Sequence, residues 1–281
     1  MYGLIAGNGR FPLLVLEEAL RRGEGVAVAA IREEADPSIE DFEERSGGKI
    51  RVHWLGLGRL GRLLKIFARE GVTEAMMAGQ VKHVRIFARD GRPAAGVLSK
   101  LPDLKMLRVL LSLPQKNTAA LIGAFADVLA QEGIRLLDST HLVPHLVAQE
   151  GVLTRRAPNQ EEGKDIEYGR RIAQQIVALD IGQTVVIKDQ AVVAVEAMEG
   201  TDAAIRRAAE LAEGRSLTVV KAARPQQDMR FDVPVLGLGT LEVLRRCRVT
   251  AVAIDAGKTL LLDRQALIEE ADRMKLALVA H

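Results

Sequence analysis

The sequence predicts an α/β protein that consists of two domains joined by a linker. Short apolar runs alternate with amphipathic segments along most of the chain, which is the pattern of repeated βαβ units. The length of 281 residues favours two domains over one. The alternation lapses after residue 138, where prolines and a glycine follow each other closely. The predicted ranges are 1–137 for the amino-terminal domain, 138–156 for the linker and 157–281 for the carboxyl-terminal α/β domain.

Composition and charge exclude several classes of protein. Hydrophobic residues make up 48% of the chain and charged residues 27%, as in ordinary globular proteins. The formal net charge of +2 gives no reason to expect nucleic acid as a partner. The single cysteine, Cys247, excludes an internal disulfide and a metal site made of cysteines. Neither a signal peptide nor an apolar run of membrane-spanning length is visible, so we expect a cytoplasmic protein, free or attached peripherally to a membrane.

The first thirty residues predict the opening of a Rossmann-like domain. The predicted elements are a strand at 2–6, a helix at 12–22 and a strand at 25–31. The turn Gly7-Asn8-Gly9-Arg10 between the first two lets backbone amides at the start of a helix approach a phosphate. Pro12 replaces the third glycine of the dinucleotide-binding fingerprint, so the pattern alone leaves phosphate binding and an empty turn equally open.

Two further polar residues are expected at the same edge of the predicted sheet. The elements that follow are a strand at 52–55, a helix at 60–70 and a strand at 74–78. Gln80 and Lys82 come directly after the last of these strands. Because ligands of an open parallel sheet bind outside the carboxyl ends of its strands, we expect both residues to face the same crevice as the glycine turn. A solvated loop without a ligand is the alternative.

Basic and apolar residues are mixed between Lys82 and Arg108. Seven basic residues stand there against only Asp90 and Asp103, with leucines, an isoleucine and a phenylalanine among them. Such a segment suits an anionic membrane surface or an amphiphile with a phosphate head group. The solvated face of an ordinary core helix explains its later part almost as well. The predicted elements are helices at 103–112 and 118–132 and a strand at 134–137.

The second half of the chain predicts another α/β unit. The predicted helices are at 164–179, 240–248 and 263–274, the last closing the fold, and the predicted strands are at 184–188, 191–196, 217–220, 251–254 and 260–262. A further helix starts at Thr201, which we expect to be its N-cap. Glu196 and Glu199 stand beside this helix start, an arrangement that suits a phosphate bound through a metal. A normally capped helix fits the same residues.

The stretch from Lys221 to Thr240 suits neither a helix nor a central strand. Two prolines and a Gly-x-Gly turn describe an ordered loop, the kind of segment that often carries catalytic groups. Asp228 and Asp232 alternate with Arg230, and Lys221 precedes them. Interleaved charges of this kind suit a divalent metal held beside a phosphate. The alternative is a surface loop whose ion pairs contribute little stability.

Four motifs in the chain resemble those of one known family. They are Leu4 to Pro12 (LIAGNGRFP), Asp180 to Gln183 (DIGQ), Glu196 to Asp202 (EAMEGTD) and Gln227 to Pro234 (QDMRFDVP). In this order, and over essentially the whole chain, they resemble the LpxI-type UDP-2,3-diacylglucosamine pyrophosphatases of lipid A biosynthesis. One departure is Asp255, where glutamate is expected before Ala-Gly-Lys-Thr.

The resemblance implies a cytoplasmic, magnesium-dependent hydrolase whose carboxyl-terminal domain is catalytic. It implies cleavage of UDP-2,3-diacylglucosamine to UMP and 2,3-diacylglucosamine 1-phosphate, with water attacking the phosphorus on the UMP side. Asp232 aligns with the acidic residue considered catalytic in that family. The expected partners are this lipid-linked UDP-sugar and the surface of the inner membrane, with no nucleic acid, and an oligomer is left open.

The resemblance and the residue chemistry together assign roles. The charge of a pyrophosphate repels nucleophiles, so its hydrolysis needs cations that neutralise developing charge and a carboxylate that holds metal or orients water. The expected catalytic residues are Asp232, Arg230 and Lys221. The expected substrate-binding residues are Gly7, Asn8, Gly9, Arg10, Gln80, Lys82, Thr201 and Gln227. The expected ligands of Mg²⁺ or another divalent cation are Asp232, Asp228, Glu199 and Asp202.

Two other functions stay open at this point. Another nucleotide-sugar enzyme, such as a transferase, would release UMP only in the presence of an acceptor other than water. A non-enzymatic carrier for an anionic lipid or a nucleotide sugar would bind its ligand without metal-dependent turnover. Asp228 and Asp232 argue against the carrier, because a site that only binds anions has little use for carboxylates.

Overall fold

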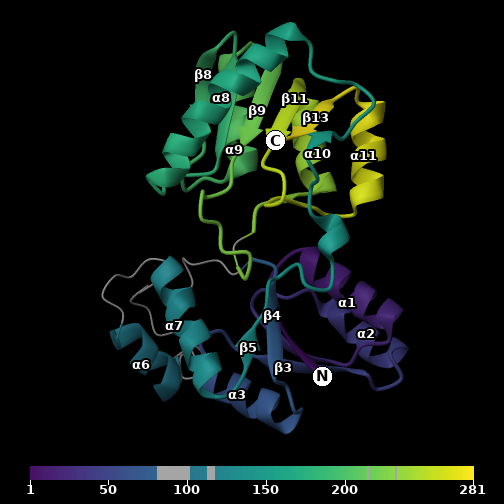
Figure 1. Cartoon of the computed structure of the whole chain (residues 1–281), viewed down its shortest axis with the longest axis vertical. Coiled ribbons are helices and arrows are strands. Elements are labelled where there is room, and N and C mark those ends of the chain that lie inside the picture. The colour runs from purple at the N-terminus through teal and green to yellow at the C-terminus, as the bar shows by residue number, and fades with distance from the viewer. Residues whose placement is uncertain (81–101, 113–117, 214–215, 232) are drawn as a thin grey trace. The chain divides into compact units, whose positions relative to one another are not determined.

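The computed structural model describes residues 1–80, 102–112, 118–213, 216–231 and 233–281. The chain forms two compact units (Figure 1). The first contains Met1–Val143 with Arg230–Asp232, and the second contains Pro144–Met229 with Val233–His281. Each unit has its own sheet and its own helices, so the predicted α/β class with two domains is confirmed. The range 138–156, for which the sequence predicts a linker, holds the 3-10 helix η2 (Pro144–Leu146) and strand β6 (Gly151–Val152).

The first unit is built on five parallel strands in the order β3-β2-β1-β4-β5. The strands are β1 (Tyr2–Ala6), β2 (Val26–Ile31), β3 (Ile50–Leu55), β4 (Glu74–Ala78) and β5 (Arg135–Leu136). The described helices are α1 (Phe11–Arg22), η1 (Pro37–Ile39), α2 (Glu40–Arg45), α3 (Leu60–Arg69), α6 (Leu104–Ser112) and α7 (Thr118–Gln131). The strand order reverses between β1 and β4, which is where doubly wound sheets bind ligands.

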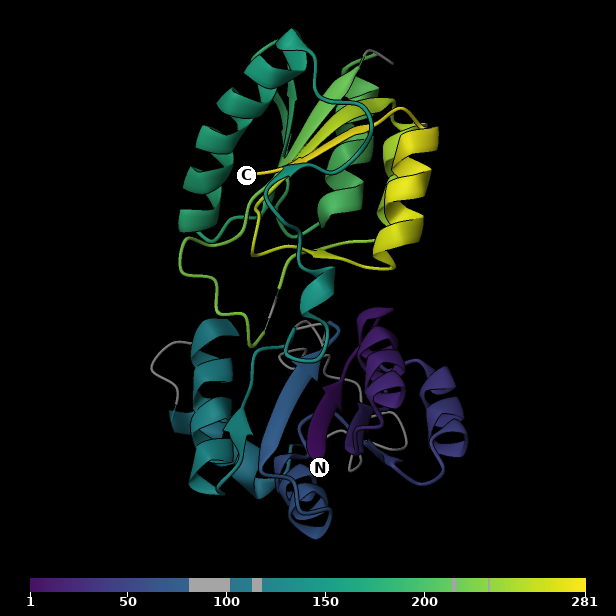
Figure 2. The ribbon, with the colours of Figure 1, turned by 45° about the vertical axis from the view of Figure 1, so that its right-hand side comes forward.

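Helices cover both faces of this first sheet. Figure 2 shows α1 and α2 on one side and α3, α6 and α7 on the other. All six residues of β2 are buried, as expected for a parallel strand that is covered on both faces. The core under α3 and α7 contains Phe67 and Leu129, both with 0% exposure. Burial of each such side chain stabilises the fold by about 1.5–3 kcal/mol.

The second unit is built on six strands in the order β6-β13-β11-β9-β7-β8. β9, β11 and β13 run parallel, and β6, β7 and β8 each pair antiparallel with a neighbour. Besides β6, the strands are β7 (Thr184–Lys188), β8 (Ala191–Val195), β9 (Leu217–Lys221), β11 (Val249–Ile254) and β13 (Ala277–Ala280). A separate parallel pair joins β10 (Val235–Leu236) to β12 (Leu260–Leu261). The helices after η2 are α8 (Gln160–Ala178), α9 (Thr201–Leu211), α10 (Leu238–Arg246) and α11 (Arg264–Arg273).

The second sheet also lies between two helical layers. Its core divides into one cluster under α8 and another under α9, α10 and α11, in agreement with the ribbon in Figure 1. A Cβ atom on Gly169 would come within 2.7 Å of Val220, so this glycine allows α8 to pack directly on β9. None of the helices in the described part of the chain is both long enough and apolar enough to cross a membrane.

Two local expectations from the sequence are wrong. The last helix does not close the fold, because β13 follows α11 and pairs in parallel with β11 inside the sheet. The four residues of β13 form an apolar run too short to be recognised as a strand without its pairing partner. Thr201 is not the N-cap of α9, since Gly200 occupies that position with φ 85°. The Thr201 hydroxyl instead donates to Glu196 Oε1 at 2.9 Å.

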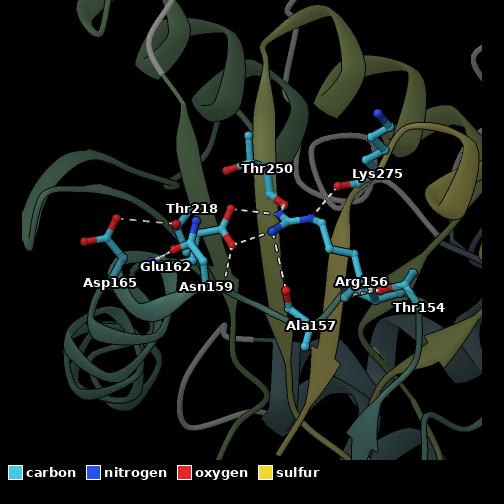
Figure 3. A network of polar contacts seen from close by, with 10 residues as sticks. Thr154, Arg156, Ala157, Asn159, Glu162, Asp165, Thr218, Thr250 and Lys275 are labelled. Carbon is cyan, nitrogen blue, oxygen red and sulfur yellow. Dashed lines mark hydrogen bonds and ion pairs between the residues drawn. The ribbon is translucent and has the colours of Figure 1, made fainter.

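A polar network joins the start of α8 to the amino-terminal end of β11 and to the turn before β13 (Figure 3). Arg156 Nη1 and Nη2 donate to the two oxygens of Glu162, both at 2.8 Å. Arg156 also donates to Lys275 O at 2.6 Å and to Thr250 O, so it links α8 to β11 and to the turn that precedes β13. Asn159 and Glu162 complete a capping box at the helix start. Burial alone would raise the pKa of the Glu162 carboxyl, but Arg156 and the other hydrogen bonds outweigh it and lower that pKa.

We predict that Glu162→Gln lowers the free energy of unfolding at neutral pH by about 2 kcal/mol, because the half-buried Arg156 then loses the carboxylate that balances its charge. The folded-state pKa of Glu162 is depressed, so its stabilisation is present above the unfolded value of about 4.3 and is lost as pH falls through the folded value. The difference between wild type and variant should therefore narrow below about pH 4 in urea titrations.

Glu161→Gln is the matched control for this prediction. Glu161 is the preceding residue on the same helix, but 74% of its side chain is exposed. Its substitution should change the unfolding free energy by less than about 0.5 kcal/mol. Equal stability of Glu162→Gln and Glu161→Gln, or a difference between them that does not depend on pH, would contradict the role given to Arg156 and Glu162.

Candidate active site

Two glycine turns meet at the carboxyl ends of β1 and β4 in the first unit. Asn8 N donates to Gln80 O at 2.8 Å, and Gln80 N donates to Asn8 O at 3.0 Å. A Cβ atom on Gly7 would lie 2.7 Å from Gln80 O, and one on Gly79 would lie 2.5 Å from Asn8 O. Gly79 also has φ 87°, which favours glycine. Any larger residue at either glycine would therefore force the two turns apart.

This turn pair brings several of the predicted substrate-binding residues together. The side chains of Asn8 and Gln80 are exposed at the same edge of the sheet. The amide N–H of Asn8 is bonded to Gln80 O, so the start of the first turn is held against the second turn. The Arg10 guanidinium lies 3.0 Å from Glu17 Oε1 on α1. Lys82 lies outside the described residues.

Polar residues also gather at one edge of the second sheet. β8 and β9 end there, and the antiparallel β7 begins there, so that Thr184 pairs with Lys221. Lys221 Nζ donates to Thr201 Oγ1 at 3.4 Å and to Val235 O at 3.2 Å. Thr201 Oγ1 also lies 3.3 Å from Thr184 Oγ1. The structure thus brings together Lys221, predicted as catalytic, and Thr201, predicted as substrate-binding.

The carboxylate of Glu196 accepts a hydrogen bond from the Thr201 hydroxyl through one of its two oxygens. One carboxylate oxygen, Oε1, accepts from Thr201, and the other, Oε2, is buried and has no hydrogen-bond partner among the described residues. A Cβ atom on Gly182 would lie 2.0 Å from Glu196 O, so the glycine of the DIGQ motif is needed for this close approach. From the sequence, Glu196 is expected beside the helix start in an arrangement that suits a metal-bound phosphate, but it is not among the expected metal ligands.

The DIGQ motif also supports the start of the loop that follows β9. Ala222 N donates to Gln183 O at 2.8 Å as the chain leaves the strand. Arg224 Nη2 donates to Asp180 Oδ1 at 2.7 Å two residues later. Asp180 adopts φ 56°, a left-handed conformation that aspartate tolerates better than most residues. The DIGQ motif therefore fixes the position of the first residues of this loop.

Asp255 and Lys258, which follow β11, also hold this loop in place. Ala223 N donates to Asp255 Oδ2 at 2.8 Å, and Arg170 Nη1 from α8 donates to Asp255 Oδ1 at 3.2 Å. Lys258 Nζ donates to Pro225 O at 2.9 Å. Sequence reasoning missed these anchoring roles of Arg170 and Lys258. The signal that was available is the position of Asp255 directly after a buried strand, at the edge where Lys221 also lies.

The middle of the loop carries the other predicted residues. Gln227 and Asp228 are half-buried, and Gln227 Nε2 donates to Asp228 O at 3.2 Å. The half-buried Arg230 is counted with the first unit, where Ser139 Oγ donates to its main-chain oxygen at 2.7 Å. Asp232 lies outside the described residues, so its predicted catalytic role stays a prediction.

The predicted metal ligands are not gathered in the described part of the chain. Glu199 Oε1 accepts from Arg207 Nη2 at 2.7 Å. Its own main-chain N–H, Arg207 and the N–H of Ala197 lower the pKa of the Glu199 carboxyl. Asp202 stands half-buried in the first turn of α9. Within 1–80, 102–112, 118–213, 216–231 and 233–281, no three His, Cys, Asp or Glu side chains form a metal-binding group. A site that includes Asp232 stays a prediction.

Comparisons with known proteins decide the family. A family profile described as the LpxI N-terminal domain matches residues 1–146, and one described as the LpxI C-terminal domain matches residues 149–279. The chain belongs to the LpxI family. A curated relative from Caulobacter vibrioides, the UDP-2,3-diacylglucosamine pyrophosphatase LpxI, is 32% identical over 284 residues, which cover 98% of this chain and 95% of the relative. The resemblance carried by the four sequence motifs is confirmed.

We predict that Lys258→Met loosens the loop without unfolding the protein. The substitution keeps an unbranched side chain but removes the ammonium group that holds Pro225 O. A hydrogen bond from a charged group contributes about 1.5 kcal/mol or more, so amide hydrogen exchange in peptides covering 222–231 should become roughly tenfold faster. Lys164→Met, which removes an exposed ion pair with Glu161, is the control. Unchanged exchange in Lys258→Met would contradict the anchoring role.

Proposed function

We propose that this LpxI-family chain hydrolyses the pyrophosphate bond of UDP-2,3-diacylglucosamine in lipid A biosynthesis. The products are UMP and 2,3-diacylglucosamine 1-phosphate. The relative from C. vibrioides supports the proposal, because its name states this substrate and it aligns with both domains. The diacylated substrate leads us to propose further that the chain works in the cytoplasm, at the surface of the inner membrane.

One observation carries the proposed chemistry, namely the anchored loop at the edge of the second sheet. Lys221, the last residue of β9, donates to Thr201, and four separate groups hold the four residues that follow. A pyrophosphate has several charged oxygens, and cations fixed before it binds stabilise the charge that develops during reaction. In the proposed mechanism Lys221 and Arg230 bind phosphate oxygens, and the planar guanidinium of Arg230 suits two oxygens at once. Asn8, Gln80 and Gln227 would orient the rest of the substrate.

Asp232 has the central role in the proposed reaction. Its carboxylate orients a water molecule and accepts a proton as the water oxygen attacks the phosphorus on the UMP side. The bond between this phosphorus and the bridging oxygen breaks, and the bridging oxygen leaves with the lipid phosphate. The proton on Asp232 then passes to solvent. Lys221 and Arg230 stabilise the negative charge on the non-bridging oxygens of this phosphorus while one bond forms and the other breaks.

We also propose that the reaction needs Mg²⁺ or another divalent cation. Such an ion would withdraw negative charge from the phosphate oxygens. Asp228 and Asp202 offer the oxygen donors that Mg²⁺ prefers, with Asp232 as the third carboxylate. Glu199 would first have to leave its ion pair with Arg207, 2.7 Å away, so it fits this role less well.

We predict that Asp232→Asn lowers kcat by about 10³-fold, because the amide cannot accept the proton from water. KM should change much less, since the amide keeps the size of the carboxylate. The measurement is UMP release from detergent-dispersed substrate. Asp127→Asn, at an exposed position of α7, is the control and should leave turnover unchanged.

Three outcomes would overturn the proposal. Near wild-type turnover in folded Asp232→Asn would refute the catalytic role proposed for Asp232. Release of UMP only with an added acceptor would indicate a transferase. Tight binding of the diacylated sugar phosphate without any turnover by the wild-type chain would indicate a carrier.

A further inference from the structure

Helix α6 carries apolar side chains on two opposite sides. Met106 and Val109 are only 8% and 6% exposed to solvent, and they pack in the core that α6 shares with α3 and α7. By contrast, Leu104, Leu107 and Leu111 are 76%, 41% and 77% exposed to solvent. The core of the first unit therefore uses one side of this helix and leaves three leucines on the other.

The exposed leucines form a single stripe. Leu107 follows Leu104 by three positions and precedes Leu111 by four, and residues at these spacings lie on one face of a helix. Arg108 is also exposed and stands four positions after Leu104, so it flanks the stripe. A single exposed leucine is normal on a protein surface, but three in one stripe indicate an interaction surface.

Cations outnumber carboxylates on and beside α3 and α6, although Asp103 directly precedes Leu104 and Glu132 lies beside Lys105. α3 packs against α6, and neither helix contains an acidic residue. Arg62, Lys65, Lys105 and Arg108 are exposed on these two helices. Lys105 forms an ion pair with Glu132, which leaves a net positive charge on the pair of helices. This face thus combines leucines with an excess of cations, the pattern of helices that lie on anionic lipid surfaces.

We propose that the outer face of α6, formed by Leu104, Leu107 and Leu111 with Arg108 beside them, docks on the anionic surface of a phospholipid bilayer. The leucines enter the boundary between head groups and acyl chains, and the cations of α3 and α6 meet lipid phosphates. A helix of nine residues with three leucines binds weakly by itself, so docking is reversible. The inference rests on the proposed function in one respect: a diacylated substrate has to be taken up from a membrane.

Other occupants suit this face less well. A second copy of the chain would bring the same cations against those of the first, and like charges at an interface repel each other. A nucleic acid would be attracted by the cations but has no use for a stripe of leucines. A bilayer with anionic head groups complements both the leucines and the charge.

The test is flotation of the purified full-length chain with phospholipid vesicles. The vesicles contain phosphatidylcholine with about one-third phosphatidylglycerol, or phosphatidylcholine alone. The α6 variant is Leu104→Gln with Leu111→Gln. The matched control is Leu179→Gln with Leu211→Gln, which removes two leucines that are 71% and 64% exposed in the second unit. Thermal unfolding confirms that both variants are folded.

We expect wild type and control to float with the anionic vesicles, and the α6 variant to bind them about tenfold more weakly. High salt should release all three proteins, because the cations contribute to binding. Equal flotation of the α6 variant and the control would overturn the inference, as would no flotation of wild type. Concentration-dependent dimers of wild type that are absent in the α6 variant would instead assign the stripe to self-association.

A separate assay keeps this test independent of the proposed function. Turnover of detergent-dispersed substrate should be the same in wild type, α6 variant and control, because the substrate no longer has to leave a bilayer. Loss of turnover only in the α6 variant would place α6 in the substrate site and overturn a purely docking role. No turnover in wild type would refute the proposed hydrolysis, while flotation would still decide the membrane contact.

Discussion

The carboxylate of Asp255 is the contact on which the arrangement of the candidate site depends most. It accepts the N–H of Ala223 at 2.8 Å and a guanidinium N–H of Arg170 at 3.2 Å, just where the chain leaves β9. Lys258 then holds the next turn through Pro225 O. Hydrogen bonds that involve a charged group are roughly twice as strong as neutral ones, so these contacts determine the path of the loop where it leaves β9.

Both sheets place polar residues by the same geometric constraint. Parallel strands end at a common edge, so residues that follow different strands lie close together although they are far apart in sequence. Asn8 and Gln80 meet in this way after β1 and β4, and Lys221 and Asp255 stand after β9 and β11. Hydrolysis of a pyrophosphate requires convergent cations and polar groups, and we propose that Lys221, at one of these strand ends, is such a cation.

The range of each interaction explains what the sequence could predict. β1, β4, β7 and most helices were predicted because their apolar patterns are local. The short strands β6, β10 and β13 were missed because pairing with distant strands stabilises them. In the site, the EAMEGTD motif located Thr201 and the charged stretch from Lys221 to Thr240 located Lys221, but their contact depends on the register of β7 against β9. The cap assigned to Thr201 was wrong because the helix starts one residue earlier than expected, so that Gly200 is the N-cap and Thr201 is already the first helical residue.

The most direct test of the central claim is the position of oxygen-18 after turnover of UDP-2,3-diacylglucosamine in labelled water. Mass spectrometry of both products, with magnesium and with a chelator, reads out which phosphorus the water attacks. Attack on the UMP-side phosphorus predicts label in UMP and none in the lipid phosphate, with turnover lost in the chelator. Label in the lipid phosphate would contradict attack on the UMP side, and undiminished turnover in the chelator would contradict the requirement for a divalent cation.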